Sequence, residues 1–187
     1  MYSTSDFRKG LKVEIDGKPF IIVEFLHVKP GKGGAFVRTK LKNMISGRVL
    51  DQTFRSGEKV GRPNLEEKDM QFLYRDGEMF CMMDNQTYEQ VHLSSEQVGD
   101  SKNFLLENIN VKVLLFNNDP IGIELPYFVE LSVTKSEPGV RGDTATGVTK
   151  PATVETGYTL HVPIFINEGD KIKIDTRTGE YVERTSK

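Results

Sequence analysis

The sequence is short of the residues that build disulfides and metal sites. Its 187 residues include one cysteine, Cys81, and no tryptophan. A lone cysteine excludes an intrachain disulfide and a cysteine-based zinc site, and His27, His92 and His161 lack metal-ligand spacing. No histidine stands beside a candidate nucleophile, and Cys81 is expected to pack in a strand. We therefore expect a protein that is not an enzyme, needs no cofactor or metal, and is located in a reducing compartment.

Long hydrophobic runs are also missing. No uncharged stretch approaches the roughly 20 residues that a membrane-spanning helix needs, and Asp6, Arg8 and Lys9 precede any apolar run at the N-terminus. We expect neither a signal peptide nor a membrane partner, and hence a cytoplasmic protein. Since 37% of the residues are hydrophobic and 28% are charged, the chain has enough apolar residues for folded cores.

The whole chain has no large excess of charge of one sign, but two of its three segments do. The formal net charge is -2. Residues 1–63 hold 13 Lys and Arg against 6 Asp and Glu, residues 64–127 hold 4 against 12, and residues 128–187 hold 8 against 9. The net charges of these segments are +7, -8 and -1. The split predicts an N-terminal segment that faces a polyanion; the alternative is solvated surfaces whose charges happen to segregate.

Strand patterns with a period of two run through the whole chain, separated by turn signals. Asp16-Gly17 is a pair suited to a tight hairpin turn with positive φ. One or two helical turns are expected near residues 94–106, with Ser95 and Ser101 as N-caps. A long loop is expected over residues 135–157. Proline-containing junctions divide the chain into 1–63, 64–127 and 128–187, which predicts three small all-β domains, the first of about five strands.

A short repeat connects the second and third segments. Residues 84–89 and 175–180 both fit the pattern D-x-x-T-x-E. Asp84 and Asp175 stand where a turn favours an aspartate that accepts backbone hydrogen bonds. The repeat predicts two related barrels, in which strands surround one short helix as in an oligonucleotide-binding (OB) fold. Chance is the alternative, because such hairpins are common.

The most distinctive segment is the glycine-rich loop V-K-P-G-K-G-G-A-F, residues 28–36, between two strong strand patterns. Pro30 stiffens its start, and glycines on both sides leave Lys32 without bulky neighbours. A phosphate-binding P-loop is excluded, because Leu26 stands where that motif needs glycine and Gly33 where it needs Ser or Thr. Two interpretations stay open: a hairpin tip with a solvated lysine, or a loop whose tip enters a narrow site.

Positive charge gathers on this loop and on the strand that follows it. Five cations fall within the 14 residues from 29 to 42, and three of them alternate along the strand, so we expect those three to share one face. RNA phosphates are the natural partner, whereas no aromatic stacking pair interleaves the cations to read bases. The residues predicted to contact RNA here are Lys29, Pro30, Gly31, Lys32, Gly33, Gly34, Arg38, Lys40 and Lys42.

A second loop, residues 137–147, is too long and too rich in glycine for a plain hairpin turn. Arg141 can pair with a phosphate, Asp143 and Thr144 can bond to bases or sugars, and Gly142 permits close backbone approach. The tripeptide Arg-Gly-Asp also occurs in adhesion ligands, which the expected cytoplasmic location argues against. A loop without a role is the remaining alternative.

Taken together, these motifs resemble the bacterial elongation factor P family over essentially the whole chain. The loop K-P-G-K-G-G-A-F is one point of resemblance, and K-P-A-T-V-E-T-G-Y-T-L-H-V-P-I-F-I-N-E-G, residues 150–169, is the other. G-V-R-G-D-T and D-T-R-T-G-E-Y-V add to them. The resemblance implies three β-barrel domains in an L-shaped, tRNA-like arrangement: an N-terminal SH3-like (KOW-like) barrel followed by two OB-fold barrels.

The resemblance also implies a function and its residues. It implies a monomeric, non-enzymatic translation factor that binds the ribosome beside the peptidyl-tRNA in the P site and relieves stalling at consecutive prolines. Lys32 would reach toward the peptidyl-transferase centre and would be the target of a lysine-modifying enzyme. Arg141, Gly142, Asp143 and Thr144 would lie near the messenger RNA at the exit site, and Tyr181 and Arg184 would contact tRNA or the small subunit. The alternatives are a general RNA-binding OB-fold protein and an elongation-factor-P-like paralogue.

Overall fold

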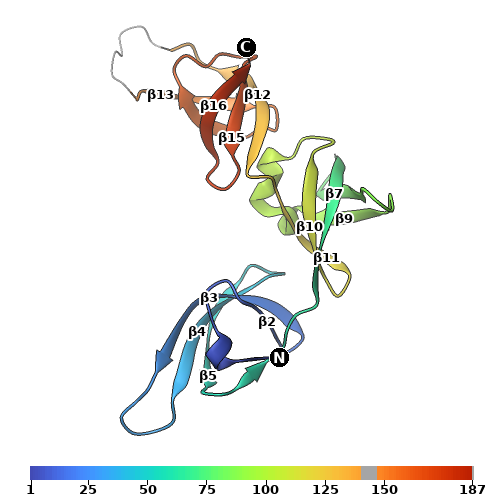
Figure 1. The fold of residues 1–187 in the computed structure, drawn as a ribbon. Helices are drawn as coiled ribbons and strands as arrows, with labels where there is room; N and C mark the ends of the chain where they lie inside the picture. Colours follow the sequence, from blue (N-terminus) through green and yellow to red (C-terminus); the bar gives the residue numbers. More distant parts are fainter. Residues whose placement is uncertain (140–146, 187) are drawn as a thin grey trace. The chain divides into compact units, whose positions relative to one another are not determined.

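Strands dominate the structure, a computed structural model in which residues 1–139 and 147–186 are described (Figure 1). These residues form sixteen β-strands, a four-residue α-helix and two short 3₁₀ helices. The predicted all-β fold is therefore confirmed. No helix of the described residues is long and apolar enough to cross a membrane.

The first segment folds around one antiparallel sheet with the strand order β2-β3-β4-β5. A second pair, β1 with β6, ties the N-terminus to the end of the segment, and Glu14 of β2 exchanges two backbone hydrogen bonds with Gly61. The pattern reading missed β1 and β6, since two-residue strands leave no period. Val13, Ile22, Val37 and Leu41 lie in the buried core. The elements are β1 (Tyr2–Ser3), η1 (Thr4–Asp6), β2 (Lys12–Ile15), β3 (Lys18–Val28), β4 (Phe36–Asn43), β5 (Val49–Arg55) and β6 (Lys59–Val60).

The Asp16-Gly17 turn between β2 and β3 is confirmed, because both residues have positive φ, 50° and 72°. Such φ values match the twist of a two-residue hairpin, and glycine adopts them without steric cost.

The second segment forms a five-stranded sheet with the order β11-β10-β7-β8-β9. The predicted helical turns follow β9, but their caps were wrong: Ser94, rather than Ser95, is the N-cap of α1. Its hydroxyl accepts from the Gln97 amide, and the Gln97 side chain accepts from the Ser94 amide, which completes a capping box. No serine caps η2, whose N-cap residue is Val98. The elements are β7 (Leu65–Asp76), β8 (Met79–Asp84), β9 (Gln90–Ser94), α1 (Ser95–Val98), η2 (Gly99–Phe104), β10 (Asn110–Phe116) and β11 (Asp119–Glu124).

The third segment forms another five-stranded sheet, with the order β14-β13-β12-β15-β16. The predicted loop over residues 135–157 was wrong in part, because it contains strand β13. Pro151 lies within this strand, although proline lacks an N–H for the ladder. The pairing with β12 begins only at Ala152, past that proline. The elements are β12 (Phe128–Ser136), β13 (Thr149–Val154), β14 (Thr159–Pro163), β15 (Lys171–Asp175) and β16 (Glu180–Ser186).

The chain packs into two compact units: residues 1–67 with 114–122, and residues 68–113 with 123–187. Within the second unit, the side chain of Phe104 from η2 joins the core of the third segment and meets the ring of Tyr158 edge-on at 5.0 Å. The Thr156 hydroxyl donates to the Asn103 carbonyl nearby. The domain boundaries at residues 63 and 127 stay a prediction.

The D-x-x-T-x-E repeat is confirmed as one turn built twice. Asp84 Oδ1 accepts from the Gln86 amide at 2.7 Å, and Asp175 Oδ1 accepts from the Arg177 amide at 2.9 Å. The fifth residue of each turn has positive φ, 61° at Tyr88 and 75° at Gly179. The two segments therefore close these hairpins with the same backbone geometry.

These aspartates predict an acid dependence of stability. Hydrogen bonds from the Gln86 amide to Asp84 and from the Arg177 side chain to Asp175 lower the pKa of both carboxyls below the ordinary value of about 3.9. Each carboxylate therefore stabilises the fold above the unfolded-state pKa, and this contribution is lost as the pH falls through the folded-state pKa. We expect urea midpoints below about pH 4 to fall more steeply for the wild type than for an Asp84→Asn, Asp175→Asn variant. Parallel midpoint curves would contradict this.

Candidate nucleic-acid interface

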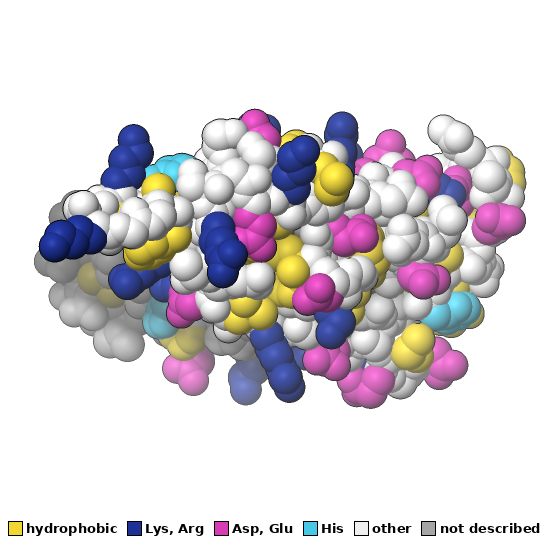
Figure 2. Space-filling view, turned by 90° about the horizontal axis from the view of Figure 1, so that it is seen from below, with side chains coloured by type: hydrophobic (Ala, Val, Ile, Leu, Met, Phe, Trp, Pro, Cys, Tyr) yellow, Lys and Arg dark blue, Asp and Glu magenta, His cyan; other side chains and the backbone are white. Residues whose placement is uncertain are grey.

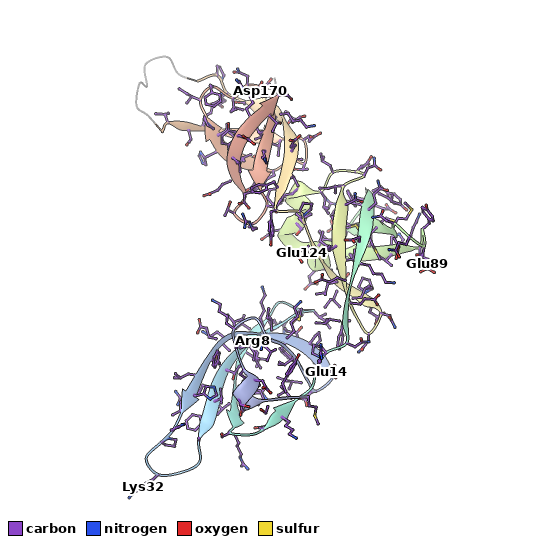
Figure 3. The ribbon with its side chains drawn as sticks, viewed as in Figure 1. Arg8, Glu14, Lys32, Glu89, Glu124 and Asp170 are labelled. Atoms are coloured by element: carbon purple, nitrogen blue, oxygen red, sulfur yellow. The ribbon has the colours of Figure 1, made fainter. Side chains whose placement is uncertain are left out.

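Lys32 stands at the tip of the hairpin formed by β3 and β4. The two strands pair from Phe20 with Asn43 out to Val28 with Phe36, and the connecting loop projects beyond them, with the Lys32 side chain at its end (Figure 3). Residues 29–34 are all exposed. Gly33 has a φ of 110°, which strongly favours glycine at this bend. Within the described residues Lys32 forms no ion pair or side-chain hydrogen bond, so its ammonium group is free to meet a partner.

The three alternating cations of β4 share one face, as predicted. Val37, Thr39 and Leu41 are buried, whereas Arg38 and Lys42 between them are exposed and Lys40 is half-buried. The pleat of the strand sends neighbouring side chains to opposite faces, so the apolar set holds the cations outward. The side of the molecule seen in Figure 2 carries Lys and Arg together with Asp and Glu and small groups of hydrophobic side chains.

The three cations are not equivalent, which the sequence pattern did not reveal. Lys40 lies directly across from Glu24 on β3 and from Asp51 on β5. Its Nζ is 3.5 Å from Glu24 Oε2. Two flanking carboxylates offset its charge, so Lys40 contributes little to the attraction of a polyanion. Glu24 and Asp51 lie on the same face of the sheet as Lys40, and this can be recognised only once the strand register is known.

Arg38 and Lys42 are the two effective cations of this face. Arg38 holds its guanidinium 5.7 Å from the centre of the Phe36 ring, a contact that leaves its hydrogen-bond donors available. Lys42 lies across from Ile21 and Val49, so no carboxylate stands directly opposite. Neither cation has an ion-pair partner among the described residues.

The opposite face of the same hairpin carries a ring pair that the sequence reading missed. Phe25 and His27 meet edge-on with centroids 5.6 Å apart. They lie across from Thr39 and Val37, and therefore on the other face of the hairpin from Arg38. The Phe25 side chain is 37% exposed. Their spacing of two along one strand was the available signal.

Tyr181 and Arg184 lie on β16, and both are engaged within the fold. Tyr181 packs against the core of its sheet, and burial raises the pKa of its phenol. Arg184 reaches Asp170 with NH1 at 3.5 Å from Oδ2, and its guanidinium lies over the Phe165 ring. Contact with RNA would therefore use the exposed part of Arg184. Arg141, Gly142, Asp143 and Thr144 of the predicted messenger-binding loop lie outside the described residues.

Three family profiles match the chain. The elongation factor P (EF-P) KOW-like domain matches residues 3–60, the elongation factor P (EF-P) OB domain matches residues 65–123, and the elongation factor P C-terminal domain matches residues 129–184. With the sheets described above, these matches bear out the predicted all-β fold class.

Whole-length relatives carry the same name. A protein named elongation factor P from Maridesulfovibrio salexigens is 59% identical over 184 residues, covering 98% of this chain and 99% of that one. Another, from Bdellovibrio bacteriovorus, is 53% identical over 186 residues, covering 100% and 99%. Among solved structures, the chain is similar to eukaryotic translation initiation factor 5A from Methanococcus jannaschii, with a TM-score of 0.58, 26% identity, and 66% of this chain and 91% of that chain covered. A Naegleria fowleri protein of the eIF-5A family shares the fold with a TM-score of 0.51 at 19% identity, covering 66% and 96%.

Proposed function

The chain belongs to the elongation factor P family, which makes it a translation elongation factor, and from this premise we propose how it acts. It binds the ribosome beside the peptidyl-tRNA in the P site, and it promotes peptide-bond formation where consecutive prolines stall synthesis. It works in the cytoplasm, as a monomer. The observation that carries this proposal is Lys32, a lysine that stands at the end of a hairpin and has no ion-pair partner among the described residues.

The protein acts by positioning and is not an enzyme. Lys32 at the tip of the loop would contact the end of the peptidyl-tRNA and hold it in a reactive geometry, while Arg38 and Lys42 on the outer face of β4 bind tRNA phosphates. Proline is a constrained participant in peptide transfer, so correct placement alone removes part of the barrier. About 1.4 kcal/mol of such stabilisation gives a tenfold increase in rate, and positioning can supply several kcal/mol.

A lysine-modifying enzyme is the second partner. The exposure of Lys32 and its glycine neighbours leaves the Nζ accessible to such an enzyme. An added group would lengthen the reach of the side chain without changing the fold of the hairpin. The messenger at the exit site is the proposed partner of Arg141, Gly142, Asp143 and Thr144, and tRNA or the small subunit is the proposed partner of Tyr181 and Arg184.

Ribosome binding tests this proposal through the non-equivalence of the cations. We expect Arg38→Glu, Lys42→Glu to weaken binding to ribosomes that carry peptidyl-tRNA by roughly tenfold or more, because neither cation pairs with a carboxylate in the described part of the chain and each lost phosphate contact lowers the affinity. The matched control is Lys171→Glu, Lys173→Glu, which changes the charge equally at lysines already paired with Glu130 and Glu183. As single variants, Lys40→Glu should weaken binding less than Arg38→Glu or Lys42→Glu, because Lys40 is already paired with Glu24. Affinities measured by co-sedimentation would decide between them.

The same measurement separates the alternative of a general RNA-binding protein. A ribosome-specific factor binds ribosomes with peptidyl-tRNA in preference to vacant ribosomes and to free RNA at equal salt. Equal losses from the β4 and Lys171, Lys173 variants, together with no preference among these targets, would contradict the proposal.

A further inference from the structure

A second cationic site lies away from the hairpin tip on the first compact unit, residues 1–67 with 114–122, which we call the N-terminal unit. An open groove of about 460 Å³ runs between the start of β2 and the segment that follows β6. Arg8, Lys12 and Arg62 line it, with Tyr2 and Asn64 beside them. Backbone bonds between Glu14 and Gly61 hold the two walls together. We call this the Arg8 groove.

The charge of the Arg8 groove is unbalanced. Its lining holds three cations and no carboxylate, the other members being Gly10, Leu11, Pro63 and Leu65. Three other surface hollows contrast with it: the hollow over β3, β4 and β5 includes Glu24 and Asp51, and the remaining two each include two acidic residues (Asp69 and Glu124; Glu107 and Glu130). Within the described residues, none of Arg8, Lys12 and Arg62 has an ion-pair partner. Three unpaired cations around one groove repel one another, and a bound anion would offset that cost.

The chemistry of the lining favours phosphate groups. Two of the three cations are arginines, whose planar guanidinium donates two parallel hydrogen bonds to a phosphate. The Tyr2 hydroxyl and the Asn64 amide are neutral donors at the same groove. The groove is open and has little apolar surface, so it suits a chain of phosphates better than an enclosed small molecule.

The position of the groove extends the contact that the hairpin can make. Arg8 and Lys32 lie at opposite ends of the N-terminal unit (Figure 3). An RNA that meets both ends would run along the unit and gain contacts that neither end supplies alone. Contacts to phosphates also fix orientation without reading sequence.

We propose that the Arg8 groove binds the phosphate backbone of an RNA helix, as a second anchor of the N-terminal unit. The inference rests on the proposed function only in its choice of RNA as the partner. Arg8, Lys12 and Arg62 contact the phosphates, and Tyr2 and Asn64 add neutral hydrogen bonds.

Salt-dependent binding of a labelled RNA duplex of about 20 base pairs tests this. We expect Arg8→Gln, Lys12→Gln, Arg62→Gln in the full chain to lower the slope of log affinity against log salt by about 3, since each lost phosphate contact contributes about 0.9, and to lower the affinity at about 0.1 M salt by roughly tenfold or more. The matched control, Lys18→Gln, Arg48→Gln, Lys59→Gln, removes three exposed cations from the same unit outside the groove. It should change the slope by less than 1. If the triple variant unfolds, Arg62→Gln alone, at an exposed side chain, should lower the slope by about 1.

Equal effects of the two triple variants would overturn the proposal. Displacement of the duplex by polyglutamate as effectively as by unlabelled RNA would overturn it in favour of an acidic protein. Displacement by ATP at equal ionic strength would overturn it in favour of a free nucleotide. Proline rescue measured with a Lys32 variant is independent of these results, so a failed groove leaves the proposed function standing.

Discussion

Replacing Lys32 by alanine is expected to reduce synthesis through a run of prolines by roughly 10- to 100-fold, while the stability of the protein stays unchanged. Such a loss corresponds to about 1.4–2.8 kcal/mol at the transition state, which is within what one positioned contact supplies. The stability is spared because the side chain is exposed and forms no side-chain hydrogen bond or ion pair within the described residues. A reporter with consecutive prolines, translated with wild-type or variant protein, gives the ratio.

Lys18→Ala is the matched control for this experiment. Lys18 is also an exposed lysine beside a hairpin turn of the same unit, yet it lies outside the glycine-rich loop. It should leave both the proline reporter and the melting temperature unchanged. Full rescue by Lys32→Ala would contradict the role of Lys32. Rescue by unmodified protein that matches protein from the native source would show that any modification at Lys32 is dispensable.

Replacing Gly179 by alanine is expected to destabilise the second unit by about 3 kcal/mol. Two effects combine: a residue with φ of 75° loses about 1 kcal/mol on gaining a Cβ, and that Cβ would collide with the Tyr158 hydroxyl. The collision also displaces the hydrogen bond that Tyr158 donates to the Gly179 carbonyl. Because Tyr158 packs against the core of the third segment and its ring contacts that of Phe104, moving Tyr158 disturbs that core. Urea unfolding measures the change.

Gly77→Ala separates the two effects. Gly77 has a φ of 59° in the turn between β7 and β8, and a Cβ there meets nothing within 4 Å, so we expect only the backbone cost of about 1 kcal/mol. The repeat supports this reasoning, since Tyr88 fills the place equivalent to Gly179 with a φ of 61° and a side chain that is 71% exposed. Similar losses at Gly77 and Gly179 would show that the contact with Tyr158 carries no energy.

The local elements were predictable where their causes are local. Turn pairs such as Asp16-Gly17 and the aspartates of the two repeat turns act on backbone groups within a few residues. The residue types at these positions therefore predict the geometry of the turns. The pair of β1 with β6 was not predictable, because the two strands are distant in sequence. Strand β13 was missed for another reason: its buried positions include Lys150 and Ala152, so no apolar alternation marks it. The Ser94 cap was missed by one residue, a common error at helix ends.

The candidate site divides in the same way. The sequence by itself determined the family, the exposed lysine in its glycine-rich loop, the alternation of Arg38, Lys40 and Lys42, and the segment charges of +7, -8 and -1. Each of these depends on residue identity and on spacing along one strand or loop. The tertiary structure decided which cations are free: register sets Lys40 between Glu24 and Asp51, and the closing of β2 onto Gly61 brings Arg62 to the groove of Arg8 and Lys12. The interaction between two charged side chains depends on the distance between them in space, and the pairing of the strands sets that distance here.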